Sequence, residues 1–107
     1  MSDTERIGCA GILRFARGEK EYVISFNEEI FAANANADNK PVERIIEELI
    51  TVRKATYGLY STFDGDDFFK TGIDRKRRMS IAAMGFNMLG HQVHHLNSIS
   101  DKYYSLI

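Results

Sequence analysis

All three histidines of this 107-residue chain lie in one short segment, GHQVHH, at residues 90–95. His91 and His95 are four positions apart, so on a helix their imidazoles project from the same face, one turn apart. Such a pair can hold zinc or another divalent transition metal. His94 falls to the side of that face and is not expected to be a ligand. Two histidines do not complete a metal site, so a further ligand must come from elsewhere.

The same spacing also occurs on helices whose histidines are solvent-exposed or hydrogen-bonded, and the spacing alone does not separate these cases. Two features favour a metal. His91 and His95 continue an apolar stripe that includes Met88 and Ile99, and burying imidazoles in such a stripe is costly without partners. In addition, no acidic residue lies close to them along the same segment.

The composition is that of a single globular domain spanning residues 1–107, with 44% hydrophobic and 27% charged residues and a net charge of −1. The balanced charge gives no sign of nucleic-acid binding. One cysteine, Cys9, excludes a disulfide within the chain, and we expect a cytoplasmic protein. No segment resembles a signal peptide or a membrane span, so we expect no membrane association.

Apolar residues at three- and four-residue spacing predict three main helices, at residues 3–17, 41–63 and 80–104. The connection at residues 18–40 is expected to be a long loop, and a second long loop is expected from residue 64 to the last helix. The predicted fold class is therefore all-α.

Several residues mark where these helices begin and end. Gly18 follows a cation at the expected end of the first helix, Pro41 begins the second, and Ser80 is the expected N-cap of the last. Asn27 precedes two glutamates, which predicts a helical turn or two inside the first long loop.

Three segments together resemble the DinB-like superfamily. SIAAMGFNMLGHQVHHLNSISDKYY resembles its last helix, which carries a GHE-x-HH-type motif, and DTERIGCAGILRFARGEK is similar to its second helix. FNEEIFAANANADNKPVERIIEELITVRKATYGL is similar to the segment and helix between them. The resemblance covers nearly the whole chain in order. It implies an up-down helical bundle, commonly dimeric, that holds a divalent metal ion with three histidines, two of which correspond to His91 and His95.

The chain departs from the family pattern in two places. Gln92 stands where a glutamate is frequent, which removes an acid that could orient a ligand. Met1 and Ser2 occupy the place of the third histidine, and the first helix of the family is absent, so we expect the domain to be N-terminally incomplete relative to the family. Asp3 or Glu5 could supply an oxygen ligand instead, although acids at a helix start are more often partners of the helix dipole.

Two functions follow as hypotheses. The first is a DinB-like protein that binds a divalent metal ion, zinc or nickel. If active, it would be a metal-dependent transferase with a low-molecular-weight thiol cosubstrate, or a hydrolase, acting on a small molecule. The alternative is a catalytically inactive helical dimerisation module without a complete metal site. A bundle that lacks one helix bares an apolar groove, so we expect a homodimer in either case.

Other features have a functional and a structural interpretation, and we favour the structural one for each. The basic segment DRKRR at residues 74–78 could contact a phosphate but is more simply a solvated loop. Cys9 could be a reactive thiol but is more simply a small core residue. Arg14 and Arg17 could face an anion but also complement the helix dipole. Four tyrosines could line a pocket but suit helix packing: Tyr57, Tyr60, Tyr103 and Tyr104.

Overall fold

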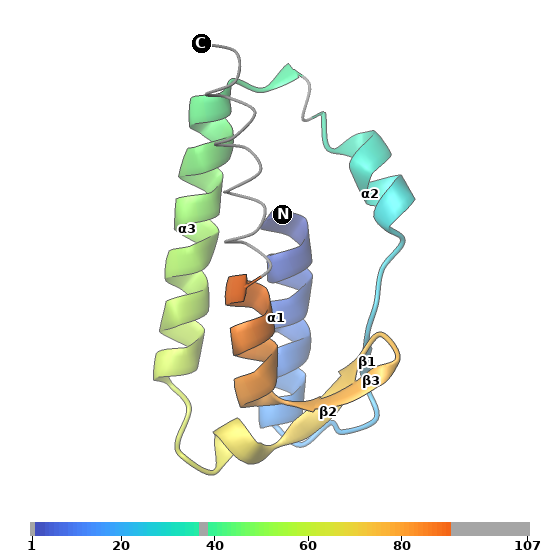
Figure 1. Cartoon of the computed structure of the whole chain (residues 1–107), viewed down its shortest axis with the longest axis vertical. Helices are drawn as coiled ribbons and strands as arrows, with labels where there is room; N and C mark the ends of the chain where they lie inside the picture. Colours follow the sequence, from blue (N-terminus) through green and yellow to red (C-terminus); the bar gives the residue numbers. More distant parts are fainter. Residues whose placement is uncertain (1, 37–38, 91–107) are drawn as a thin grey trace.

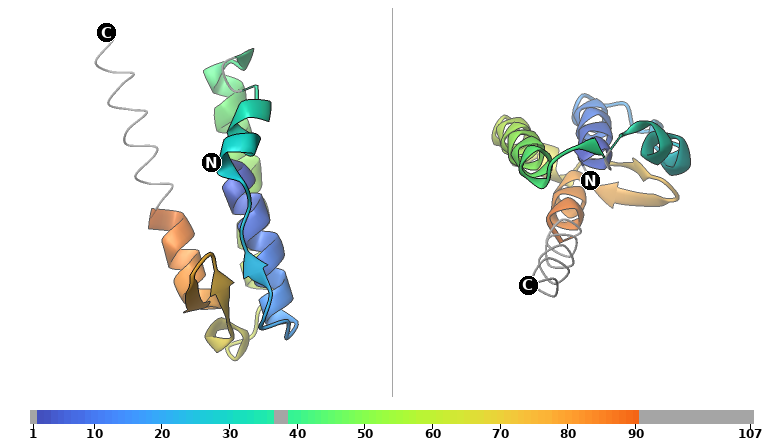
Figure 2. Two further views of the ribbon diagram at one scale, coloured as in Figure 1. Left: turned by 90° about the vertical axis from the view of Figure 1, so that its right-hand side faces the viewer. Right: turned by 90° about the horizontal axis from the view of Figure 1, so that it is seen from above.

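The computed structural model of the protein describes residues 2–36 and 39–90 and is mostly helical (Figure 1). Two long helices, α1 (Ser2–Ala16) and α3 (Val42–Ser61), lie side by side. A further helix over residues 81–90 faces both of them, and Figure 2 shows the three as the corners of a triangle when viewed from above. The predicted boundaries of the first two helices are confirmed to within two residues. The predicted last helix begins where expected, and its residues from 91 onward lie outside the described part.

The helix ends follow the residues that marked them in the sequence. Gly18 has a φ of +102°, and the N–H groups of Gly18 and Glu19 donate to the carbonyls of Phe15 and Arg14, at 3.1 and 2.9 Å. This Schellman arrangement satisfies carbonyls that the end of α1 would leave unpaired. The Ser80 hydroxyl accepts from the N–H of Ala83 at 3.1 Å, which confirms the predicted N-cap.

The connection between α1 and α3 is not only a loop. It contains a two-residue strand, β1 (Val23–Ile24), and a short helix, α2 (Glu28–Asn34), whose N-cap Asn27 accepts from the N–H of Ile30. The predicted helical turn is therefore confirmed. The connection is long enough to carry the chain back to the other end, so α1 and α3 run in the same direction (Figure 1). α1 and α3 thus do not alternate up and down, whereas α3 and the helix at 81–90 do.

The second predicted loop is also wrong in part. After a 3₁₀ turn, η2 (Asp67–Phe69), the chain forms a hairpin of β2 (Thr71–Asp74) and β3 (Arg77–Ser80). β1 pairs with β2 in parallel and β3 pairs with β2 in antiparallel, giving a three-stranded sheet in the order β1-β2-β3. The all-α prediction therefore holds for the long elements only.

Two glycines allow this sheet to approach α1. A Cβ atom on Gly72 of β2 would collide with the ring of Phe15, and one on Gly11 of α1 would collide with the side chain of Ile24 in β1. A glycine inside a strand often marks a site where another element approaches closely, as Gly72 does here.

The main core lies where the sheet meets the lower ends of the helices. Its members are buried apolar side chains from α1, β1, the segment directly after α3 and the helix at 81–90, with exposures of 8% or less: Ile12, Phe15, Ala16, Ile24, Phe63, Ile81 and Met84. Above it, Leu49 and Val52 of α3 are also buried. Among the described residues, no helix has the length and apolar character needed to cross a membrane.

Candidate functional site

The two residues predicted as metal ligands, His91 and His95, lie outside the described residues, as do His94, Tyr103 and Tyr104. Within residues 2–36 and 39–90, no group of three or more His, Cys, Asp or Glu side chains is close enough to hold a metal ion. The described residues do include Gly90, which directly precedes His91 in the sequence. Gly90 lines the same cavity as Thr4 and Gly8 of α1, so the helix at 81–90 ends beside the first turns of α1.

A buried ionic cluster lies in those first turns. Glu5 of α1 is 1% exposed, although the sequence suggested a surface acid at a helix start. The Arg53 guanidinium of α3 binds the Glu5 carboxylate through two hydrogen bonds: Nη2 donates to Oε1 at 3.0 Å and Nε donates to Oε2 at 3.3 Å. The Arg53 side chain is itself only 17% exposed. A two-bond pair of this kind fixes the orientation of the carboxylate.

Thr56 and Cys9 extend the cluster. The Thr56 hydroxyl lies 2.5 Å from Glu5 Oε2, 3.1 Å from the Val52 carbonyl and 3.3 Å from Cys9 Sγ. A hydroxyl has one proton, and the nearest, charged acceptor is the best partner for it. Thr56 therefore donates to Glu5, and its oxygen accepts from the Cys9 S–H.

This arrangement makes Cys9 a poor nucleophile. Burial raises the pKa of its thiol, and the nearby charge of Glu5 raises the pKa further. A reactive cysteine has a lowered pKa and an electropositive surrounding. The structure therefore favours the interpretation of Cys9 as a packed helix residue with a hydrogen-bonded thiol.

Tyr60 of α3 lies next to this cluster. Its hydroxyl donates to the Ile81 carbonyl at 3.0 Å, and its ring touches Gly85, where a Cβ would come within 2.9 Å. Burial raises the pKa of Tyr60, and the nearby Cys9 and Glu5 raise it further, so the phenol is protonated near neutral pH. Tyr60 thus joins α3 to the helix at 81–90, as expected for a packing role.

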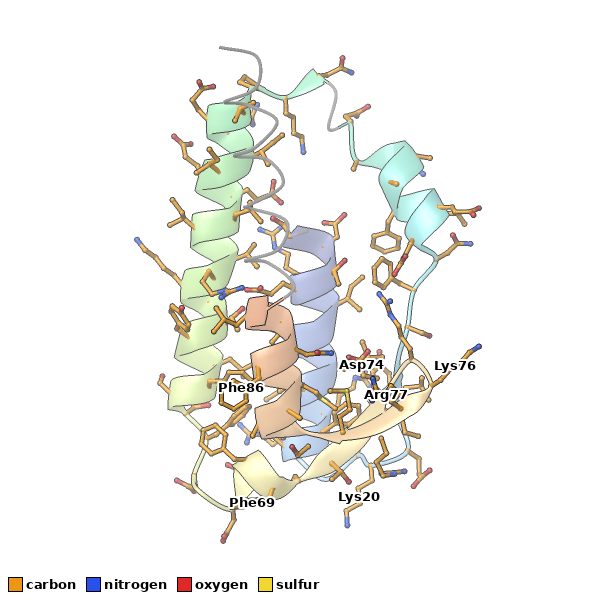
Figure 3. The ribbon with its side chains drawn as sticks, in the orientation of Figure 1. Lys20, Phe69, Asp74, Lys76, Arg77 and Phe86 are labelled. Carbon is orange, nitrogen blue, oxygen red and sulfur yellow. The ribbon has the colours of Figure 1, made fainter. Side chains whose placement is uncertain are left out.

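Two cavities lie on either side of the helix at 81–90. One of about 590 Å³ separates it from α1 and the hairpin, and its walls include Thr4, Ile12 and Met84. The other, of about 340 Å³, separates it from α3 and is lined mainly by apolar side chains, with Arg53 and Thr56 at one end. The ionic cluster therefore borders a cavity on the α3 side. Figure 3 shows Phe86 on the side of its helix nearer α3.

Several of the other basic residues pair with acids at the surface. Arg14 pairs with Glu19 at 3.0 Å and its guanidinium lies 4.4 Å from the centre of the Tyr22 ring. Arg75 pairs with Glu28. At the tip of the hairpin Lys76 points away from the body of the molecule (Figure 3). Arg75, Lys76 and Arg77 also line the cavity between the helix at 81–90 and α1.

The sequence contains a signal for the ionic cluster. Glu5 is one turn from Cys9 and two turns from Ile12, so it lies on the buried side of α1. Arg53 and Thr56 lie one turn apart on α3, again on a side with buried residues. A charged residue on each of two buried helix faces predicts an ion pair between the helices, because an unpaired buried charge is too costly.

Comparison with known proteins adds no further constraint, since no family model, curated protein or solved structure matches the chain.

Proposed function

We propose that the protein binds one divalent transition metal ion, zinc or nickel, with His91 and His95 as two of the ligands. The one-turn spacing of the two imidazoles supports this proposal, as does the resemblance of their segment to the last helix of DinB-like proteins. The structural observation that carries it is the buried carboxylate of Glu5, placed near the point where the described chain ends at Gly90.

The directions of the two helices indicate that Glu5 lies near Gly90, where the described chain ends. The helix at 81–90 runs opposite to α1, and a Cβ on Gly8 would lie 3.6 Å from the sulfur of Met88. One turn back from Gly8 is Glu5, and two residues on from Met88 is Gly90, so both steps lead toward the same end of the molecule. His91 is the next residue in the sequence.

Glu5 has the chemistry of a third ligand. A carboxylate joins two histidines in many zinc sites. Arg53 and Thr56 would then orient the ligand, a role that hydrogen-bonding neighbours commonly have around a metal. A metal ion held this way supplies Lewis acidity toward a bound water, thiol or carbonyl.

Titration calorimetry of the full chain, stripped of metal with a chelator and then dialysed, tests the proposal. We expect one Zn²⁺ or Ni²⁺ per chain, with affinity reduced about 100-fold or more by His91→Ala or His95→Ala. His94→Ala is the matched control and should bind as the wild type does. Glu5→Gln should weaken binding about 10- to 100-fold. Absence of binding by the wild type, or an equal loss in His94→Ala, would refute the proposal.

A further inference from the structure

We propose that the cavity between α1, the hairpin and the helix at 81–90 binds an amphipathic monoanion, a carboxylate carried on a flexible apolar chain. The inference is independent of the metal proposal, because it rests on the residues of the hairpin and of the cavity walls. The cavity measures about 590 Å³. Small-molecule sites usually have volumes of roughly 300–1,000 Å³, so we expect a small ligand rather than another protein.

The walls of the cavity are mainly apolar. Ile12 of α1 and Ile24 of β1 line it and belong to the buried core. Three of the chain's four methionines, Met79, Met84 and Met88, also line it. The unbranched thioether side chain adapts its shape to what it contacts, and methionine is therefore common on surfaces that bind varied apolar groups. This composition favours a flexible apolar chain as the body of the ligand.

One end of the cavity is basic. Its lining includes three successive cations of the hairpin, Arg75, Lys76 and Arg77, and one acid, Asp74. Arg75 pairs with Glu28, which is not part of the lining. When both acids are counted, the hairpin retains one net positive charge at the cavity. A single carboxylate balances that charge, whereas a cationic ligand is repelled by it.

Arg77 is the side chain best placed to bind the carboxylate. It lies two residues before Met79 in β3, so both side chains project from the same face of the strand, and both line the cavity. Asp74 is its partner in the register of the hairpin (Figure 3). Neither Asp74 nor Arg77 has an ion pair with another described residue. The Arg77 guanidinium can therefore bind a ligand carboxylate through two hydrogen bonds.

The cavity is long enough for an alkyl chain anchored at the hairpin. Its wall on α1 extends from Ile12, at the level of the sheet, to Thr4, about 12 Å at a rise of ~1.5 Å per residue. The alkyl chain of decanoate has a similar length. Gly8 lies midway along this wall, and a Cβ there would already lie 3.6 Å from the sulfur of Met88. We therefore expect the alkyl chain to pass beside Gly8.

Titration calorimetry with decanoate, on the full chain stripped of metal, tests the proposal. We expect a Kd on the order of 100 µM, as for a small ligand of this size. Decylammonium has the same chain with the opposite charge and should bind at least ~10-fold more weakly. Arg77→Gln should weaken decanoate binding about 5-fold or more. Arg78→Gln is the matched control, because Arg78 projects from the other face of β3 and does not line the cavity, and its effect should stay within ~2-fold.

Gly8→Leu tests the position of the alkyl chain, because the added side chain fills the space beside Met88. It should weaken decanoate binding at least ~10-fold in a chain that thermal unfolding shows to be folded. A wild type that does not bind decanoate would overturn the proposal. Equal affinity for decylammonium, or equal losses in Arg77→Gln and Arg78→Gln, would also overturn it, because the basic end would then not select the ligand. So would unchanged binding by a folded Gly8→Leu variant, since the ligand would then lie elsewhere.

Discussion

Replacing Glu5 with alanine should strongly destabilise the fold, because it leaves the guanidinium of Arg53 without its carboxylate. Glu5 is 1% exposed and the Arg53 side chain 17% exposed, so neither group is well hydrated in the folded state. Removing one partner of a buried ion pair typically costs about 3–5 kcal/mol. Since Arg53 can regain some water at its exposed edge, we expect a loss near the lower end, about 3 kcal/mol.

Urea unfolding followed by circular dichroism, with a chelator present to exclude any metal effect, measures this loss. For a slope of ~1.5–2 kcal/mol per molar urea, the midpoint should fall by about 1.5–2 M. Glu43→Ala is the matched control, because Glu43 is exposed and has no ion pair with a described residue. Its effect should stay within ~0.5 kcal/mol.

A double-mutant cycle separates the ion pair from the loss of side-chain packing. Arg53→Met keeps much of the arginine stem but removes the positive charge that Glu5 faces, so it too should destabilise. The double variant Glu5→Ala/Arg53→Met should be more stable than the sum of the single losses predicts, by more than ~1 kcal/mol. Additive losses, or a Glu5→Ala effect below ~1 kcal/mol, would refute the assignment of this pair as a buried, energetically coupled contact.

Three further predictions follow from the structure. Gly72→Ala should destabilise the fold by about 1–3 kcal/mol, because the added Cβ collides with the ring of Phe15. Gly58→Ala, in open space on α3, should instead stabilise the fold by up to ~1 kcal/mol, and urea unfolding measures both effects. The Cys9 thiol, with its raised pKa, should react with a disulfide reagent at pH 8 more slowly in the folded chain than in urea, and equal rates would contradict this. The hydrogen bond from Lys70, together with that from the N–H of Asp64, lowers the pKa of Asp67 from its ordinary 3.8. Asp67 therefore contributes stability above that pH, which is lost as the pH falls below it, and Asp67→Asn should flatten this part of the acid unfolding curve.

The long helices could be predicted from the sequence because their signals are local. Apolar spacing and terminal residues such as Gly18 and Ser80 act within one or two turns, and the structure uses both as expected. The sheet could not be predicted in the same way. β1 has two residues, and its partner strand is far along the chain, so the pairing depends on the packing of both against α1. The hairpin turn also lacks the usual glycine or asparagine, since Arg75 holds the positive φ of +62°.

The candidate site was predictable in part. The residue types of His91 and His95 and their spacing are sequence facts, and the metal that they suggest stays a prediction. The burial of Glu5 does not follow from its place in the sequence, because a helix start favours acids at the surface and the burial of this one depends on Arg53, which lies in another helix. Pairing across helices is a property of the fold, and the sequence reveals it only when both buried faces are compared.

The metal content of the purified full chain tests the central claim most directly. Elemental analysis of protein prepared without chelator should give close to one zinc or nickel ion per chain. The same preparation of His91→Ala or His95→Ala should contain almost none, and His94→Ala should match the wild type. Metal-free wild-type protein that also fails to take up added Zn²⁺ or Ni²⁺ would contradict the account.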